Sequence, residues 1–138
     1  MNWLSWALLS AFFAALTAVL AKIGVKDVDS NLATAIRTAV ILIFATAVAI
    51  ATNNQGLSSL KPRTWLFLTL SGVATGASWL CYFRALQLGE VAQVAPVDKL
   101  SVVIAIAIAA IFLHEQLVWR HWVGASLIVA GVLVLARS

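Results

Sequence analysis

Charged residues are scarce in this chain. Only 10% of its 138 residues are Asp, Glu, Lys or Arg, whereas a soluble domain carries roughly 25%. Hydrophobic residues make up 63% of the sequence, and the mean hydropathy is +1.03. Because so few polar residues are available to cover a water-exposed surface, the composition excludes a soluble protein and indicates that the natural solvent of the chain is lipid.

Other absences narrow the function. The single cysteine, Cys81, excludes an internal disulfide. The nine Lys and Arg residues form no basic cluster, so the net charge of +4 does not indicate nucleic-acid binding. No metal-ligand spacing, nucleophile elbow or phosphate-binding loop occurs, so the sequence predicts no catalytic residue, no metal site and no cofactor. No basic residue precedes the first apolar run, which favours a retained spanning helix over a signal peptide.

Five apolar runs are long enough to cross a bilayer, whose hydrocarbon core is roughly 30 Å thick at about 1.5 Å of helix rise per residue. Runs of this length are about twice as long as barrel strands, so helices are favoured. The sequence predicts an all-α membrane protein, a single domain over residues 1–138, with polar loops that include residues 52–56. The predicted helices are residues 3–23, 32–51, 65–86, 91–113 and 119–136.

The loop charges give almost no preference for either orientation in the membrane. The tryptophans Trp3, Trp6, Trp65, Trp119 and Trp122 mark helix starts on one face, here named side A. Side A carries Lys61, Arg63 and Arg120, and side B carries Lys22, Lys26 and Arg137, with Arg84 as a fourth if it counts as a loop residue. Because the positive-inside rule needs an excess of basic residues on one side, we weigh two hypotheses equally: insertion in both orientations with an antiparallel homodimer, or one fixed orientation set by other features.

Four ionisable residues fall inside predicted helices, towards side B: Arg37, Arg84, Asp98 and Lys99. Ionisable groups within a membrane are costly and are candidates for function. Asp98 lies about 10 Å below the interface, too deep to reach water, whereas Arg37 and Lys99 have side chains long enough to snorkel. Asp98 could pair with Arg37 or Arg84 in a substrate cavity, which would prefer negative or zwitterionic groups because cations outnumber Asp98. A purely structural ion pair is the equal alternative.

Further features surround this charged group. Pro96 removes the helical partner of the Ala92 carbonyl and predicts a kink beside Asp98. Ser101 continues a small, partly polar stripe from Asp98. Trp79 and Tyr82 lie deeper than the tryptophan belt, as candidate cavity residues or as packing residues. The pattern from Gly72 to Gly76 and the pair Gly124 and Gly131 predict close helix contacts.

The C-terminal half of the chain resembles a known family. The segments that carry the resemblance are Tyr82-Phe83-Arg84-Ala85-Leu86-Gln87-Leu88-Gly89, Val94-Ala95-Pro96-Val97-Asp98-Lys99-Leu100-Ser101-Val102-Val103, Leu113-His114-Glu115-Gln116-Leu117 and the Gly-rich run from Gly124 to Gly131. Together they resemble an EamA-like domain of the drug/metabolite transporter superfamily, in a short bacterial or archaeal branch. Val102 departs from the family, because many members have proline there.

The resemblance implies one EamA-type repeat, where longer members fuse two repeats in opposite orientation. It therefore implies a homodimer and a secondary transporter of the prokaryotic inner membrane. Such a protein would export or exchange small polar metabolites or amino-acid-like solutes by alternating access. A small multidrug-type cation exporter is one alternative, although the first predicted helix lacks the expected acidic residue. A non-transporting membrane subunit is the other alternative.

Overall fold

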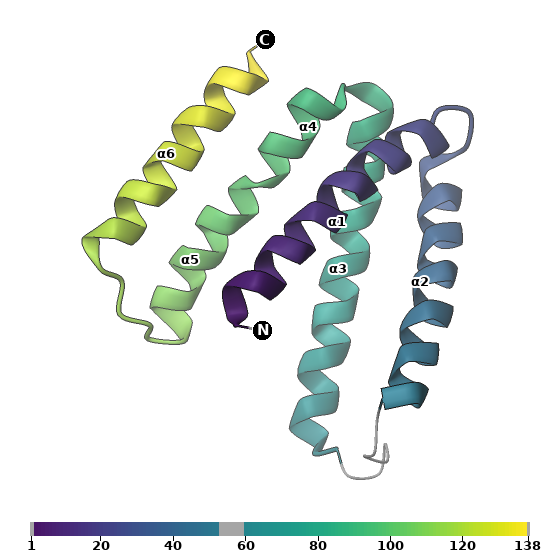
Figure 1. Ribbon diagram of the computed structural model, residues 1–138, viewed down its shortest axis with the longest axis horizontal. Coiled ribbons are helices and arrows are strands. Elements are labelled where there is room, and N and C mark those ends of the chain that lie inside the picture. Colours follow the sequence, from purple (N-terminus) through teal and green to yellow (C-terminus); the bar gives the residue numbers. More distant parts are fainter. Residues whose placement is uncertain (1, 53–59, 138) are drawn as a thin grey trace. The chain divides into compact units, whose positions relative to one another are not determined.

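The computed structural model describes residues 2–52 and 60–137, which form helices and no strand (Figure 1). This confirms the predicted all-α class. Of the predicted loop at residues 52–56, Thr52 ends a helix and residues 53–56 lie outside the described residues. The helices are α1 (Trp3–Gly24), α2 (Ser30–Thr52), α3 (Pro62–Leu88), α4 (Val91–Asp98), α5 (Leu100–Phe112) and α6 (Trp119–Ala136).

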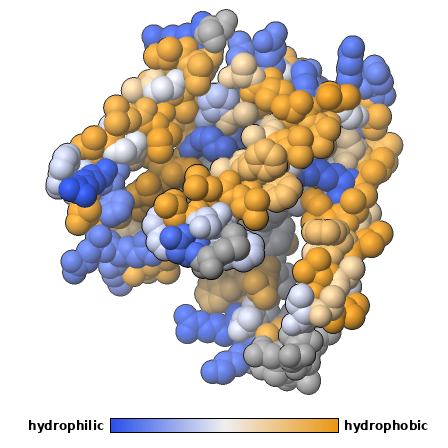
Figure 2. Space-filling model, viewed as in Figure 1, coloured by the Kyte–Doolittle hydropathy of each residue, from blue (hydrophilic) through white to orange (hydrophobic). Residues whose placement is uncertain are grey.

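Five helical segments of the described chain are long and apolar enough to cross a membrane, as predicted. They are α1, α2, α3, the segment Val91–Phe112 that contains both α4 and α5, and α6. Their lengths of 18 to 27 residues fit a hydrocarbon core of roughly 30 Å. Hydrophobic residues cover most of the visible helix surface in Figure 2. The chain is therefore a multi-pass membrane protein.

Two helices begin earlier than the hydropathy predicts, because polar residues form their first turns. The Asp29 carboxylate accepts the backbone N–H groups of Asn31 and Leu32 at 3.0 and 3.1 Å, which makes it the N-cap of α2. Helix α3 begins at Pro62, where a missing N–H is harmless and the fixed φ favours the helix. The start of α2 therefore lies two residues, and that of α3 three residues, before the predicted boundary.

The predicted fourth helix is interrupted at Lys99, three residues after Pro96. The Lys99 N–H donates to the Pro96 carbonyl at 3.0 Å, and the Val102 N–H donates to the Lys99 carbonyl at 3.0 Å. Both bonds span three residues, as in a 3₁₀ turn, instead of four. The proline nitrogen cannot donate to the Ala92 carbonyl. The interruption lies next to Asp98, where the sequence predicts a kink, and divides the span into α4 and α5.

A short irregular segment joins α5 to α6. His114 has a φ of 54°, in the left-handed region that commonly ends a helix. The Glu115 N–H reaches back to the Ala109 carbonyl at 3.4 Å. At the start of α6, the His121 Nδ1 accepts the N–H of Val118 at 3.1 Å. Both histidines and Glu115 therefore lie at helix ends, and His121 satisfies a backbone donor.

The chain divides into two compact units, Leu20–Gln87 and a second that combines Met1–Val19 with Leu88–Ser138. In the first unit, the buried side chains gather where α1 ends, α2 begins and α3 ends: Val25, Ser30, Thr34, Phe83 and Leu86. In the second unit, α6 packs against α4 and α5, with Ala125 and Val132 buried. The single-domain assignment over residues 1–138 stays a prediction.

Candidate functional site

Arg37 of α2 lies against two aromatic rings of α3. Its guanidinium carbon is 4.4 Å from the centroid of the Trp79 ring and 5.3 Å from that of Phe83. Trp79 and Phe83 are four residues apart, so they lie on the same face of α3. Tyr82, the residue immediately before Phe83, interacts electrostatically with Arg37. These four residues are named the arginine–aromatic cluster below.

The cluster lies well inside the membrane-spanning part of both helices. Arg37 is seven residues after the first residue of α2, or about 10 Å along the helix. Trp79 and Phe83 are nine and five residues before the last residue of α3, or about 13 and 7 Å. The guanidinium is thus held at the level of these rings.

The aromatic contacts attract the Arg37 cation but do not neutralise it. An arginine at the centre of a spanning helix costs roughly 2.5–3.5 kcal/mol by insertion measurements, and Arg37 lies about one-third of the way along α2. A cation–π contact contributes about 0.5–2 kcal/mol. A ring attracts the cation but carries no net charge, so the full positive charge of Arg37 remains. Within the described part of Leu20–Gln87, no carboxylate lies within salt-bridge distance of Arg37.

Polar contacts hold the C-terminal end of α3, about one turn beyond the cluster, against the end of α1 and the α1–α2 connection. The Gln87 Nε2 donates to the carbonyls of Val25 and Val28 at 3.2 and 2.6 Å, so one side chain fastens α3 to the α1–α2 connection. The Lys22 Nζ donates to the Leu86 carbonyl at 2.6 Å. Trp79, Phe83 and Gln87 follow one another at four-residue spacing, so one face of α3 carries the whole arrangement.

Helix α2 presents a matching polar face. Ser30 and Thr34 are buried, and Arg37 follows one turn later. The hydroxyls of Thr34 and Thr38 donate to the carbonyls of Ser30 and Thr34, each at 2.8 Å. Their hydrogen bonds are therefore satisfied within α2. The Arg37 guanidinium, by contrast, lies against aromatic rings, which do not accept its N–H groups as an oxygen would.

In the second unit, Asp98 pairs with its neighbour. The Lys99 Nζ is 3.3 Å from the Asp98 Oδ2, and both side chains are at least one-third exposed. Ser101, the next residue of the predicted stripe, is exposed. The pair lies at the interruption between α4 and α5, because Asp98 is the last residue of α4 and Lys99 is the residue between the helices.

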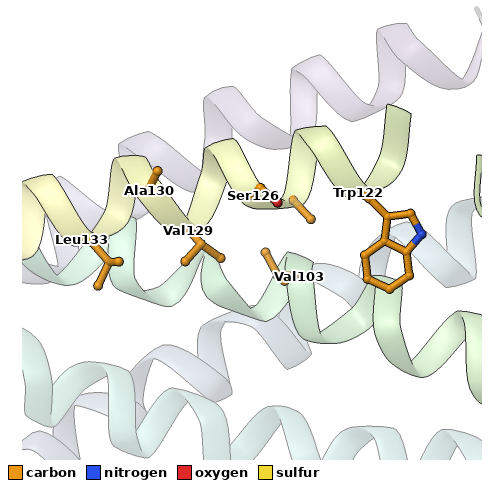
Figure 3. A pocket seen from close by; sticks show the side chains of 7 residues that line it. Val103, Trp122, Ser126, Val129, Ala130 and Leu133 are labelled. Carbon is orange, nitrogen blue, oxygen red and sulfur yellow. The ribbon is translucent and has the colours of Figure 1, made fainter. Parts of the chain in front are cut away.

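A shallow apolar groove runs along α6. Val103 of α5 and the α6 residues Trp122, Ala125, Ser126, Val129, Ala130 and Leu133 line a volume of about 370 Å³. Figure 3 shows Val103 and Val129 reaching into the same space between the two helices. Ser126 is the polar side chain among the lining residues. The groove therefore offers packing surface for an apolar group and little that could recognise a charged one.

The sequence-predicted residues fall into separate groups. Arg37, Trp79 and Tyr82 come together, and Asp98 joins Lys99. Arg84 is exposed and donates to the Gln87 Oε1 at 3.0 Å. The pairing of Asp98 with Arg37 or Arg84 stays a prediction.

Two residues of this site were missed from the sequence. Phe83 completes the aromatic contact of Arg37, and Gln87 connects α3 to the α1–α2 loop. Their four-residue spacing from Trp79 was the available signal, because it places all three on one helix face. Among the described residues, no group of three or more His, Cys, Asp or Glu side chains lies close enough to hold a metal ion.

The sequence model of the EamA-like transporter family matches residues 1–137. The chain belongs to this family. The resemblance seen in its C-terminal half therefore extends to all five candidate spanning segments. An uncharacterized transporter in the cobO 3′ region of a Sinorhizobium species is 56% identical over 136 residues, which is 98% of this chain and 96% of the relative. This EamA-like protein is thus similar over its full length to another short transporter.

Similarity to a second group of proteins is partial. Probable 4-amino-4-deoxy-L-arabinose-phosphoundecaprenol flippase subunits ArnE are 36% identical over 73 residues in Pseudomonas fluorescens and 38% identical over 78 residues in Pseudomonas aeruginosa. These matches span 53% and 56% of this chain and 62% and 64% of the relatives. No solved structure gives a significant match. Family membership therefore supports a transporter function for this EamA-like protein.

Proposed function

We propose that this EamA-like protein is a secondary transporter that exports or exchanges small polar metabolites or amino-acid-like solutes by alternating access. The observation that carries the proposal is the family match over residues 1–137. Ionisable groups within the spans add support, because such groups are costly in lipid and commonly mark solute or ion pathways. Arg37 is one such group, and the Asp98–Lys99 pair is another. The pair lies at the interruption between α4 and α5, where three-residue hydrogen bonds replace the regular helical pattern and the backbone can change conformation during transport.

We further propose that the working unit is a homodimer in the inner membrane of a prokaryote. Gly72, Gly76, Gly124 and Gly131 face open space, since a Cβ built on any of them meets nothing within 4 Å in the described chain. Small residues at a helix surface allow a second helix to approach closely. The nearly balanced loop charges add support for an antiparallel pair. The relatives named above are bacterial.

A lipid-linked phosphate is a second candidate substrate. It is favoured by the partial similarity to the ArnE subunits, which are named as probable flippase subunits for a phosphoundecaprenol derivative. Their description as subunits also favours the view that a chain of this type works with a second chain. The small polar solute remains the leading candidate, because the Sinorhizobium transporter matches the whole chain whereas the ArnE subunits match about half of it.

Transport by purified protein tests the proposal. Liposomes that contain the chain are loaded with a panel of labelled amino acids, organic acids and organic cations, and release is followed with and without external solute. We expect the wild type to release at least one class faster than empty liposomes. Release of no solute by correctly folded protein would contradict the transporter function and favour a non-transporting subunit.

The role of the charged pair is tested in the same assay. Asp98→Asn removes the charge that Lys99 faces, and Glu115→Gln removes a charge from the exposed α5–α6 segment. We expect Asp98→Asn to reduce transport at least tenfold while the protein keeps its helical circular dichroism and elutes as one species. Glu115→Gln should stay within twofold of the wild type. Loss of folded protein on Asp98→Asn would instead show that the pair is structural.

A further inference from the structure

We propose that Arg37 is the residue that binds the anionic group of the substrate, a phosphate or a carboxylate. This inference rests on the proposed transport function and deepens it, because it assigns a substrate class. The site is the arginine–aromatic cluster of α2 and α3, where the guanidinium lies 4.4 Å from the Trp79 ring and 5.3 Å from the Phe83 ring.

The first argument is the charge balance around Arg37. Its unit, Leu20–Gln87, contains two carboxylates, Asp27 and Asp29. Asp29 accepts two backbone N–H groups as the cap of α2, and Asp27 is exposed in the α1–α2 connection. In the other unit, Asp98 is paired with Lys99. Neither carboxylate of Leu20–Gln87 therefore pairs with Arg37, and the charge of Arg37 is not neutralised within its unit.

The second argument is that the guanidinium is held in place. Long side chains near helix ends normally extend towards the interface, where water solvates the charge. Arg37 instead lies at the level of Trp79 and Phe83, about one helical turn or more inside α3. The fixed end of α3, where Gln87 binds the Val25 and Val28 carbonyls, keeps these rings in position. The cluster is thus preorganised before any ligand arrives.

The third argument is the chemistry of the donors. A guanidinium offers five N–H groups in a planar fork that matches the oxygens of a carboxylate or phosphate. Aromatic rings attract the cation through their faces and do not replace these oxygen acceptors. A bound anion would therefore both neutralise Arg37 and fill its donors, and the half-buried Trp79 ring would contact the apolar part of the same solute.

The chain supplies a matched control within the same molecule. The guanidinium carbon of Arg63 lies 5.7 Å from the centroid of the Phe67 ring, also at four-residue spacing. Arg63 is exposed in the first turn of α3, next to the helix start, whereas Arg37 is half-buried. Both residues are arginines over an aromatic ring, but Arg63 contacts one ring of its own helix near the helix start, whereas Arg37 lies deeper, against two rings of the neighbouring helix. An effect specific to the proposed site must appear at Arg37 and not at Arg63.

Protection of the wild-type protein from arginine modification tests the site without a variant. The full chain in nanodiscs of phosphatidylcholine is treated with phenylglyoxal, and modification at each arginine is followed by mass spectrometry. We expect inorganic phosphate or acetate, compared with sodium chloride at equal ionic strength, to slow modification of Arg37 at least fivefold and that of Arg63 less than twofold. Equal slowing at both residues, or no modification of Arg37 at all, would overturn the proposal.

Two further conditions separate the possible sources of the anion. If phosphatidylglycerol in the nanodisc protects Arg37 and added phosphate has no effect, the occupant is a lipid headgroup and the substrate assignment is wrong. If Asp98→Asn makes Arg37 react at least fivefold faster, Asp98 is its partner and the proposal is also wrong. We expect Asp98→Asn to leave Arg37 protection by phosphate unchanged.

Transport then distinguishes this inference from the proposed function. In liposomes, Arg37→Gln should reduce release of glycerol 3-phosphate or glutamate at least tenfold, whereas Arg63→Gln should stay within twofold of the wild type. Arg37→Lys keeps the charge if Arg37→Gln fails to fold, and it should retain measurable anion release. A wild type that releases choline and no anion would overturn the inference and leave the transporter function standing. A wild type that releases nothing would contradict the function itself.

Discussion

A few polar side chains in this apolar protein have well-defined binding partners. Lys22 and Gln87 bind backbone carbonyls near the helix ends, Asp98 binds its neighbour Lys99, and Arg37 binds aromatic rings. Each of these contacts reduces the cost of a polar group in or near lipid. The contact of Arg37 differs in kind, because it leaves a net charge uncompensated within its unit. At the residue scale, Arg37 is therefore the feature that most requires a functional explanation.

Gln87 provides a stability prediction at this scale. Gln87→Ala removes the donor to the Val25 and Val28 carbonyls and the acceptor of Arg84. We expect the free energy of unfolding to fall by about 1–2 kcal/mol, the upper range for side-chain hydrogen bonds in membrane proteins. Thermal unfolding in detergent micelles would measure the loss. Gln93→Ala, at a half-buried glutamine of α4, should change stability by less than about 0.5 kcal/mol.

An equal loss in both variants would mean that Gln87 acts only through general packing. Its four-residue spacing from Phe83 places it on the same helix face, but hydropathy treats every glutamine alike and does not show what that face contacts. The α1–α2 connection that receives its hydrogen bonds lies about 60 residues away in the sequence. Only the fold brings the end of α3 to that connection.

At the scale of helices, local signals account for most boundaries. Asp29 and Pro62 are familiar helix-start residues, and they explain why α2 and α3 begin before their apolar runs. The hydropathy-based boundaries missed both starts because a first turn can be polar while its backbone is already helical. The same reasoning identified Pro96 as a helix breaker and predicted a kink beside Asp98. The observed interruption is at Lys99, where two three-residue hydrogen bonds tighten the backbone.

Pro96 gives the prediction for this scale. Pro96→Ala restores an N–H that can donate to the Ala92 carbonyl and removes the ring that crowds it. We expect α4 and α5 to join into one continuous helix, with at least tenfold slower hydrogen exchange at the Lys99 and Val102 amides. Hydrogen–deuterium exchange followed by mass spectrometry or NMR would measure this. Transport should fall if the interruption is the hinge for alternating access.

A control variant separates the two possible causes of the interruption. Val94→Ala changes the same helix two residues away but leaves the backbone donors unchanged, so exchange at Lys99 should remain as in the wild type. Persistence of the interruption after Pro96→Ala would assign it to the adjacent Asp98–Lys99 pair instead. Either result identifies which residue keeps α4 and α5 apart.

For the molecule as a whole, five described segments are long and apolar enough to span a membrane. If each crosses once, the two ends of the chain lie on opposite faces. The basic residues of its connections are nearly balanced, with three on side A and three or four on side B. We propose insertion in both orientations, because orientation normally follows an excess of Lys and Arg on the cytoplasmic side. This arrangement would allow one chain to supply both halves of an antiparallel dimer.

Reporter fusions at the C-terminus test this whole-molecule prediction. Alkaline phosphatase and green fluorescent protein, which are active on opposite sides of the inner membrane, should both give signal when fused after residue 138. Arg137→Ala together with Lys26→Ala removes two side-B charges and should shift the ratio of the two signals at least threefold. Signal from only one reporter in the wild type would establish a fixed orientation and would remove the charge argument for an antiparallel pair.

The sequence alone determined the class of this protein, the five spans and the family resemblance. Those properties depend on apolar length and on short local motifs, and both are readable along the chain. Tertiary structure decided which polar groups meet. It held Arg37 against Trp79 and Phe83, and it brought Gln87 to the α1–α2 connection. The physical reason is that the partner of a polar group within the helices depends on which residues the folded helices bring close to it. Hydropathy along the sequence contains no information about these contacts.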